Sequence, residues 1–144
     1  MPTYQIYVNK GRLSSEEKKK VASAITDGHI SQTGAPRYYV QVIINETEDE
    51  NRFIAGRNND KVLWIYGDVR TRPAEQNAAL MNELVQRTTE VCNYEKDMIW
   101  CDLNGIEPQN IMKFLTVFPP AGEEQRWHDS LPDETKDAIK RMQE

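Results

Sequence analysis

The stretch TYQIYVNKGRLSSEEKKKVASAITDGHI, residues 3–30, decides the fold that we expect. From Thr3 to Val8, aromatic and aliphatic side chains occupy every second position, which is typical of a strand buried on one side. Ser14 and Glu17 then have the spacing of a helix capping box, so a helix begins near Ser15. Its inward face consists of residues four apart: Val21, Ile25 and His29.

A strand completes this first unit, and the same plan recurs about 60 residues later. Gly34 and Pro36 end the first helix, and residues 39–44 predict a second, more fully buried strand. Residues 62–66 predict the next strand, and Pro73 stands where a first helical residue is favoured. A second helical stripe and a fourth strand at residues 98–103 follow, the stripe being Leu80, Leu84, Val85 and Thr88.

These patterns predict one α/β (α+β) domain over residues 1–144, built from two consecutive βαβ units. We place the units at about residues 2–46 and 61–105, with a surface connection at 47–60 and a tail at 106–144 that holds a short helix from Pro132 to about Met142. Parallel pairing within each unit gives a four-stranded sheet with both helices on one face. Trp64 and Trp100 then need cover on the other face, which favours oligomerisation.

Composition excludes several classes of function. The 144 residues carry a net charge of -5, so no positive field exists to hold nucleic acid. No apolar run approaches the roughly 20 residues of a membrane span. Cys92 and Cys101 form neither a CxxC pair nor a disulfide framework. We therefore expect a cytoplasmic protein that binds neither nucleic acid nor membranes.

Several short motifs in a fixed order resemble the cis-3-chloroacrylic acid dehalogenase group of the tautomerase superfamily. The resemblance runs over nearly the whole chain. Its motifs are Met1-Pro2-Thr3-Tyr4, residues 24–29 (AITDGH), Gln41-Val42, Ile99-Trp100, and Gly122-Glu123-Glu124 followed by Trp127 and Ser130-Leu131.

The resemblance implies a homotrimer of a tautomerase-like fold and a catalytic amino-terminal proline, here Pro2 once Met1 is removed. It also implies that His29, Arg70 and Arg72 bind and polarise a small carboxylate substrate, with no metal and no cofactor. Two family residues are not matched, since the catalytic glutamate aligns with Lys113 and an assisting tyrosine with Asp102. Asn110 and Tyr39 are weaker candidates for the pocket lining.

The residues themselves indicate the chemistry. A free proline amine titrates near neutral pH, and nearby cations lower its pKa, so Pro2 beside Arg70, Arg72 and Lys113 should act as a base. Arg70 and Arg72 project to one side at the end of a strand and the start of a helix, where a carboxylate binds readily. Enol–keto tautomerisation needs only one base and such cations, whereas haloacrylate hydration also needs a carboxylate to activate water. Proton-transfer isomerisation of a 2-oxo or unsaturated carboxylate is therefore favoured.

Four alternatives stay open. One is a cis-3-haloacrylate dehalogenase or hydratase. Another is a malonate semialdehyde decarboxylase-like lyase, suggested by the Arg-x-Arg spacing before Glu75-Gln76, although Pro36-Arg37 stand where its aspartate belongs. The third is a non-catalytic binding protein, as in the macrophage migration inhibitory factor group, because a retained Met1 turns the amine into an amide. The last is an isomerase or cyclase recruited to secondary metabolism.

Overall fold

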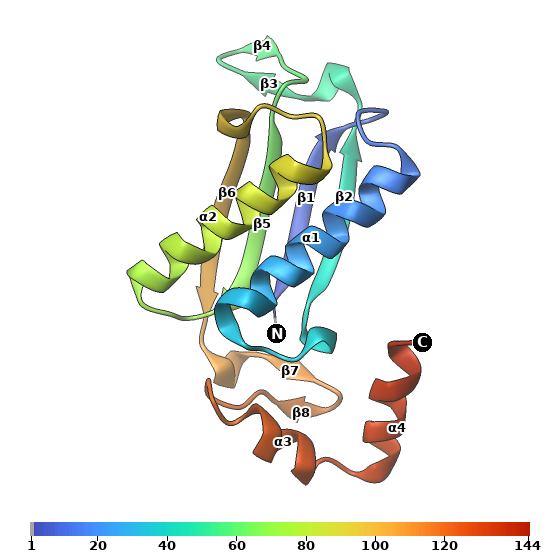
Figure 1. The fold of residues 1–144 in the computed structure, drawn as a ribbon, viewed down its shortest axis with the longest axis vertical. Helices are drawn as coiled ribbons and strands as arrows, with labels where there is room; N and C mark the ends of the chain where they lie inside the picture. The colour runs from blue at the N-terminus through green and yellow to red at the C-terminus, as the bar shows by residue number, and fades with distance from the viewer. Residues whose placement is uncertain (1) are drawn as a thin grey trace.

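The structure is a computed structural model that describes residues 2–144, and the expected removal of Met1 lies outside that range. A four-stranded sheet carries two long helices on one face, and a smaller tail lies beyond one end of the sheet (Figure 1). The main elements are β1 (Thr3–Asn9), α1 (Ser15–Thr33), β2 (Gln41–Thr47), β5 (Leu63–Arg70), α2 (Ala74–Val91) and β6 (Ile99–Ile106).

The strand order is β2-β1-β5-β6. Pairing is parallel between β1 and β2 and between β5 and β6, and antiparallel between the two central strands β1 and β5. Each parallel pair is joined by its own helix, and α1 and α2 lie side by side on the same face (Figure 1). The prediction of two βαβ units that share one sheet is therefore confirmed.

Local sequence explains where the helices begin and end. The Ser14 hydroxyl accepts a hydrogen bond from the Glu17 N–H, and the Glu17 carboxylate accepts one from the Ser14 N–H, which completes the predicted capping box. Gly34 ends α1 in the left-handed conformation with a φ of 66°, where a side chain is disfavoured. Pro73 directly precedes α2, one residue from its predicted place.

The prediction for residues 39–44 was wrong in two respects. Tyr39 belongs to a short 3-10 turn, η1 (Arg37–Tyr39), and the strand begins only at Gln41. The strand is also less buried than expected, with its residues exposed or half-buried. The physical reason is that β2 is an edge strand and α1 covers only one face of the sheet, so the alternate side chains stay open to solvent.

Each βαβ unit is followed by a 3-10 turn and a hairpin whose two strands are two residues long each. After β2 these are η2 (Asp49–Asn51), β3 (Phe53–Ile54) and β4 (Arg57–Asn58), within the predicted surface connection. After β6 they are η4 (Pro108–Asn110), β7 (Met112–Lys113) and β8 (Thr116–Val117). A 3-10 turn also precedes β6, η3 (Lys96–Met98).

The tail continues with α3 (Glu124–Ser130), which was not predicted, and α4 (Asp133–Met142), which matches the expected short helix. Tail and sheet have separate apolar cores. One core fills the space between the sheet and the two long helices, and the other joins Tyr39 and Ala35 to tail residues such as Phe118 and Trp127. Among the helices described, none is long and apolar enough to cross a membrane.

Candidate functional site

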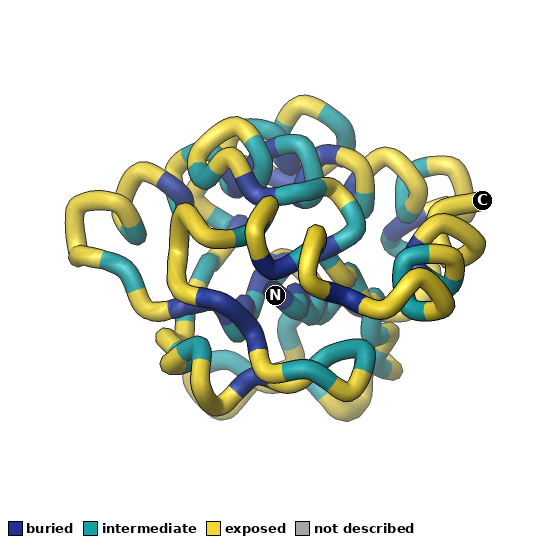
Figure 2. Tube along the Cα trace, turned by 90° about the horizontal axis from the view of Figure 1, so that it is seen from below, coloured by how far each residue is buried: buried dark blue, intermediate teal, exposed yellow. Residues whose placement is uncertain are grey.

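Pro2 lies buried at the start of a central strand, at the end of the sheet that faces the tail. Its carbonyl accepts a hydrogen bond of 3.0 Å from the Gln41 N–H at the start of β2. On the other side Thr3 pairs with Asp68, so the end of β5, with Arg70, runs alongside Pro2. Figure 2 looks at this end of the molecule and shows the amino terminus at its centre, surrounded by chain on every side.

Tyr4 links this strand to the last turn of α1. It follows Pro2 by two residues, and its side chain points to the helix-covered face of β1. The Tyr4 hydroxyl lies 2.7 Å from His29 Nδ1, and both residues are almost fully buried. Gly67, beside Tyr4 on β5, leaves room for the phenol ring, since a Cβ there would lie 2.6 Å from a ring carbon.

His29 is a neutral imidazole in this environment. Burial lowers its pKa from the ordinary 6.5 to about 3, and the positive charges of Arg72 and Arg70 add to the effect. Its second ring nitrogen, Nε2, is buried and has no hydrogen-bond partner among the described residues. Such an unpartnered polar atom is rare in a protein interior, which makes Nε2 a candidate for contact with a ligand.

Arg70 is the last residue of β5, and its guanidinium binds two residues of the tail. Nη2 forms an ion pair with the Glu124 carboxylate of α3, and Nη1 donates to the Pro119 carbonyl at 3.0 Å. Burial opposes ionisation of Glu124, but the hydrogen bond and charge of Arg70 hold the pKa of this carboxyl below its ordinary value. Arg70 therefore fastens the tail to the end of the sheet.

Arg72 differs from Arg70 in having no acidic partner. Its Nη1 donates to the Arg70 carbonyl at 3.1 Å, and it forms no ion pair with any residue in the described range 2–144. Burial lowers its pKa, with the charge of Arg70 as the next cause. Arg72 is thus a half-buried cation beside His29, and such a group attracts an anion strongly.

Lys113 and Tyr39 both line a cavity on the tail side, of about 390 Å³. Its lining joins the start of β2 to the β7–β8 hairpin and the end of α4: Tyr38, Tyr39, Val40, Gln41, Lys113, Phe114, Met142 and Gln143. Gln41 connects this cavity to Pro2 through the backbone hydrogen bond already described. Asn110 is exposed in η4, outside this lining.

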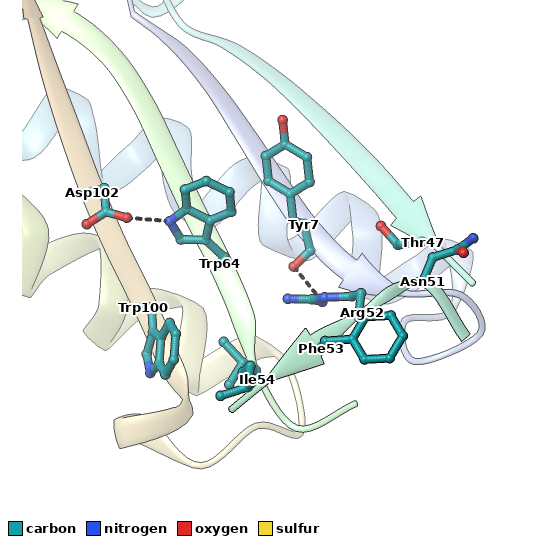
Figure 3. A pocket seen from close by; sticks show the side chains of 10 residues that line it. Tyr7, Thr47, Asn51, Arg52, Phe53, Ile54, Trp64, Trp100 and Asp102 are labelled. Atoms are coloured by element: carbon teal, nitrogen blue, oxygen red, sulfur yellow. Dashed lines mark hydrogen bonds between the residues drawn. The ribbon is translucent and has the colours of Figure 1, made fainter. Parts of the chain in front are cut away.

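Asp102 lies elsewhere, on the open face of the sheet. Its carboxylate accepts a hydrogen bond of 2.6 Å from the Trp64 indole N–H (Figure 3). Both residues line an apolar cavity of about 500 Å³ that also holds Tyr7, Phe53 and Trp100. Tyr4 and His29 occupy the opposite, helix-covered face, so within one chain the structure does not bring Asp102 to Pro2.

Two residues of this site were absent from the predicted set. Tyr4 had a signal in the sequence, because it follows Pro2 at the spacing that places two side chains on one strand face. Glu124 stands in one of the motifs of the resemblance, but nothing in the sequence pairs it with Arg70 across 54 positions.

Comparisons with known proteins agree with this architecture. The model of a family described as "Putative oxalocrotonate tautomerase enzyme" matches residues 1–129. The 2-hydroxymuconate tautomerase of Comamonas testosteroni is 43% identical over 56 residues, which are 39% of this chain and 87% of that protein.

Solved structures extend the likeness over the tail. The crystal structure of N1, a member of the cis-3-chloroacrylic acid dehalogenase family, matches with a TM-score of 0.89 and 28% identity over 96% of this chain and 99% of that one. A wild-type fused 4-OT described as an asymmetric trimer shares the fold, with a TM-score of 0.75 and 18% identity over 80% of this chain and 94% of its own. The family expected from the motifs is thereby confirmed, and the chain belongs to the Tautomerase_3 family of the tautomerase superfamily.

Proposed function

We propose that the protein is a cofactor-independent isomerase that moves a proton between oxygen and carbon in a small 2-oxo or unsaturated carboxylate. Pro2, with Met1 removed, is the base that takes up the proton and then returns it. The observation that carries the proposal is Arg72, a half-buried cation without an acidic partner in the described chain, beside neutral His29 and at the strand end where Pro2 lies.

The two arginines have different roles in this proposal. Arg72 binds the substrate carboxylate, because its charge is not neutralised by a described residue. Arg70 is already paired with Glu124, with side-chain exposures of 5% and 18%, so it positions the tail and adds to the positive potential. An anionic enolate formed by proton removal is stabilised by the same cations.

The acids near the site favour isomerisation over hydration of a haloacrylate. Hydration needs a carboxylate that is free to activate water. Among the described residues, Glu124 is the acidic group that acts on both arginines, and its hydrogen bond with Arg70 occupies it. A dehalogenase or hydratase remains the second candidate because Glu124 lies close enough to Arg70 and Arg72 to serve if the ion pair opens.

We also propose that the active form is a homotrimer, as one fused 4-OT relative is. The open face of the sheet supports this, because it exposes large apolar side chains, and such a surface is typical of a subunit interface. On this face Trp100 is 47% exposed and Ile43 40%, and Phe53 of the β3–β4 hairpin is 61% exposed.

The test is ketonisation of phenylenolpyruvate by protein whose intact mass shows that Met1 is absent. We expect Pro2→Ala to lower kcat/KM by about 100-fold or more. Arg72→Met should cause a loss of similar size, because it removes the charge that holds the carboxylate. Arg57→Met, an exposed arginine of β4, is the matched control and should stay within about twofold of the wild type. Unchanged activity in Pro2→Ala, or an inactive Met1-free protein, would refute the proposal.

Arg70→Met separates the two arginine roles. It leaves Glu124 without its partner in a largely buried place, so it should lower the free energy of unfolding by about 3–5 kcal/mol. Arg72→Met should cost far less stability while it removes activity. Chemical denaturation of both variants measures this difference, and equal losses of stability would contradict the division of roles.

A further inference from the structure

We infer that Tyr4 donates its hydroxyl proton to His29 Nδ1, and that this fixes His29 as a neutral Nε2–H donor aimed at an oxygen of the substrate. Tyr4 is then a positioning residue, and His29 is the group that touches the substrate. The inference rests on the proposed function for its substrate class, but its structural half does not.

The direction of the Tyr4–His29 hydrogen bond follows from the partners available. Two arrangements fit a separation of 2.7 Å, with either Tyr4 or His29 as the donor. If His29 donates from Nδ1, the Tyr4 proton has no acceptor among the described residues, and the bare Nε2 lone pair has no donor there. If Tyr4 donates, only the Nε2–H group is left without a partner. The second arrangement leaves fewer buried polar atoms unsatisfied and is therefore favoured.

The protonation states of both residues agree with this direction. Burial raises the pKa of the Tyr4 phenol well above its ordinary value, so the hydroxyl keeps its proton and can donate it to a hydrogen bond. Burial likewise keeps the imidazole neutral, so one of its nitrogens must be an acceptor. Nδ1 is that acceptor, and the ring proton is on Nε2.

The surroundings of His29 indicate what Nε2–H binds. Arg72 and Arg70 are the charged residues of the described chain that act on this imidazole, and both are cations. Two cations and a neutral N–H donor together suit an electron-rich oxygen, such as the 2-oxo or enolate oxygen of a bound acid. Arg72 takes the carboxylate and His29 takes the neighbouring oxygen. This differs from the role expected from the resemblance, in which the histidine binds the carboxylate itself.

Nitrogen-15 NMR of the His29 ring in Met1-free protein at neutral pH tests the structural half without any substrate. We expect Nε2 to carry the proton and Nδ1 to have the shift of an unprotonated ring nitrogen. Tyr4→Phe keeps the ring but removes the donor, so the Nδ1–H tautomer should become populated. Tyr94→Phe, which removes a buried hydroxyl that has no hydrogen-bond partner among the described residues, is the matched control and should leave the His29 signals unchanged. An Nδ1–H tautomer in the wild type, or unchanged His29 signals in Tyr4→Phe, would overturn the inference.

Phenylpyruvate as ligand tests the second half. Its binding should shift the Nε2–H signals and leave the Nδ1 nitrogen shift nearly unchanged, whereas the reverse pattern would refute the contact. With phenylenolpyruvate as substrate, Tyr4→Phe should lower kcat about tenfold or more and change KM less, because a misdirected donor mainly weakens stabilisation of the enolate. A change in KM alone would contradict this role.

The two proposals fail in different ways. An Nε2–H tautomer in a protein without tautomerase activity would refute the proposed function and keep the structural half. Activity that depends on Pro2, together with an Nδ1–H tautomer, would do the opposite.

Discussion

The two βαβ units have the same plan but differ at one pair of buried positions. In the first unit α1 turns Val21, Ile25 and His29 inward, and in the second α2 turns Leu80, Leu84 and Thr88 inward at the same spacing. The first inward residue of the strand is Tyr4 in β1 and Leu63 in β5. The pattern of strand and helix is thus repeated. Leu63 and Thr88 of the second unit take the places that Tyr4 and His29 have in the first.

The difference shows what makes a buried polar residue available to a ligand. Thr88 donates its hydroxyl to the Leu84 carbonyl of its own helix at 2.7 Å, so its donor is satisfied. His29 uses one nitrogen on Tyr4 and keeps Nε2 without a partner among the described residues. The first unit therefore has a buried nitrogen near Pro2 that is free to bind a ligand. The second unit has no such atom at the matching residue, Thr88.

The largest effect that we expect from this difference between the units is a loss of folding stability at acidic pH, caused by His29. Its pKa is about 3 in the folded protein and near 6.5 in the unfolded chain, so between these values only the unfolded chain binds the proton. This contribution to stability is complete above pH 6.5 and is lost as the pH falls through the window, at up to about 1.4 kcal/mol per pH unit.

Urea unfolding of wild type and His29→Gln at several pH values measures this effect. The carboxylates are common to both proteins, and glutamine does not titrate. The stability advantage of the wild type at pH 7 should therefore shrink, or reverse, towards pH 4. A constant difference across that range would show that His29 is not buried as a neutral ring.

The next effect concerns the space that Tyr4 requires and Leu63 does not. Gly67→Ala puts a Cβ at 2.6 Å and 2.8 Å from two carbons of the Tyr4 ring, so it should cost about 1–3 kcal/mol of folding free energy and disturb the bond to His29. Gly105→Ala, whose Cβ would meet no atom closer than 3.3 Å, is the milder control. Thermal and urea unfolding give the two values.

Combination with Tyr4→Leu makes the test specific. A leucine imitates the second unit and should relieve most of the clash, so Gly67→Ala should cost less in that background. The same cost in both backgrounds would place the strain elsewhere, for example at Leu103, whose Cδ2 is 2.9 Å from the added carbon.

Most of the frame was predictable because it depends on local patterns. Alternation in Thr3–Val8, the capping box at Ser14 and the proline before α2 each act within a few residues, and each led to the correct element. The start of β2 was missed because Tyr39 and Val40 are strand formers, whereas Pro36 and the tail core hold residues 37–39 in a turn.

The site was only partly predictable for a related reason. Pro2, His29, Arg70 and Arg72 came from the resemblance, and their closeness depends on the register that sets Thr3 against Asp68. The pairing of Arg70 with Glu124 spans 54 positions and depends on how the tail folds back, which no local pattern encodes. Asp102 came from an alignment, and the alternation of β6 puts its side chain on the open face of the sheet, beside Trp64.

The smallest effect is expected at Thr88, and it is the most direct test of the difference between the units. Thr88→Val keeps the branched shape and removes only the hydroxyl, while the Leu84 carbonyl still accepts the backbone N–H four residues on. No buried group loses its last partner, so the free energy of unfolding should change by less than about 1 kcal/mol and kcat/KM should stay within about twofold. Urea unfolding and the phenylenolpyruvate assay measure both. A loss of activity comparable to that of a His29 variant would mean that the second unit also supplies a functional polar group, and that the two units divide the chemistry between them.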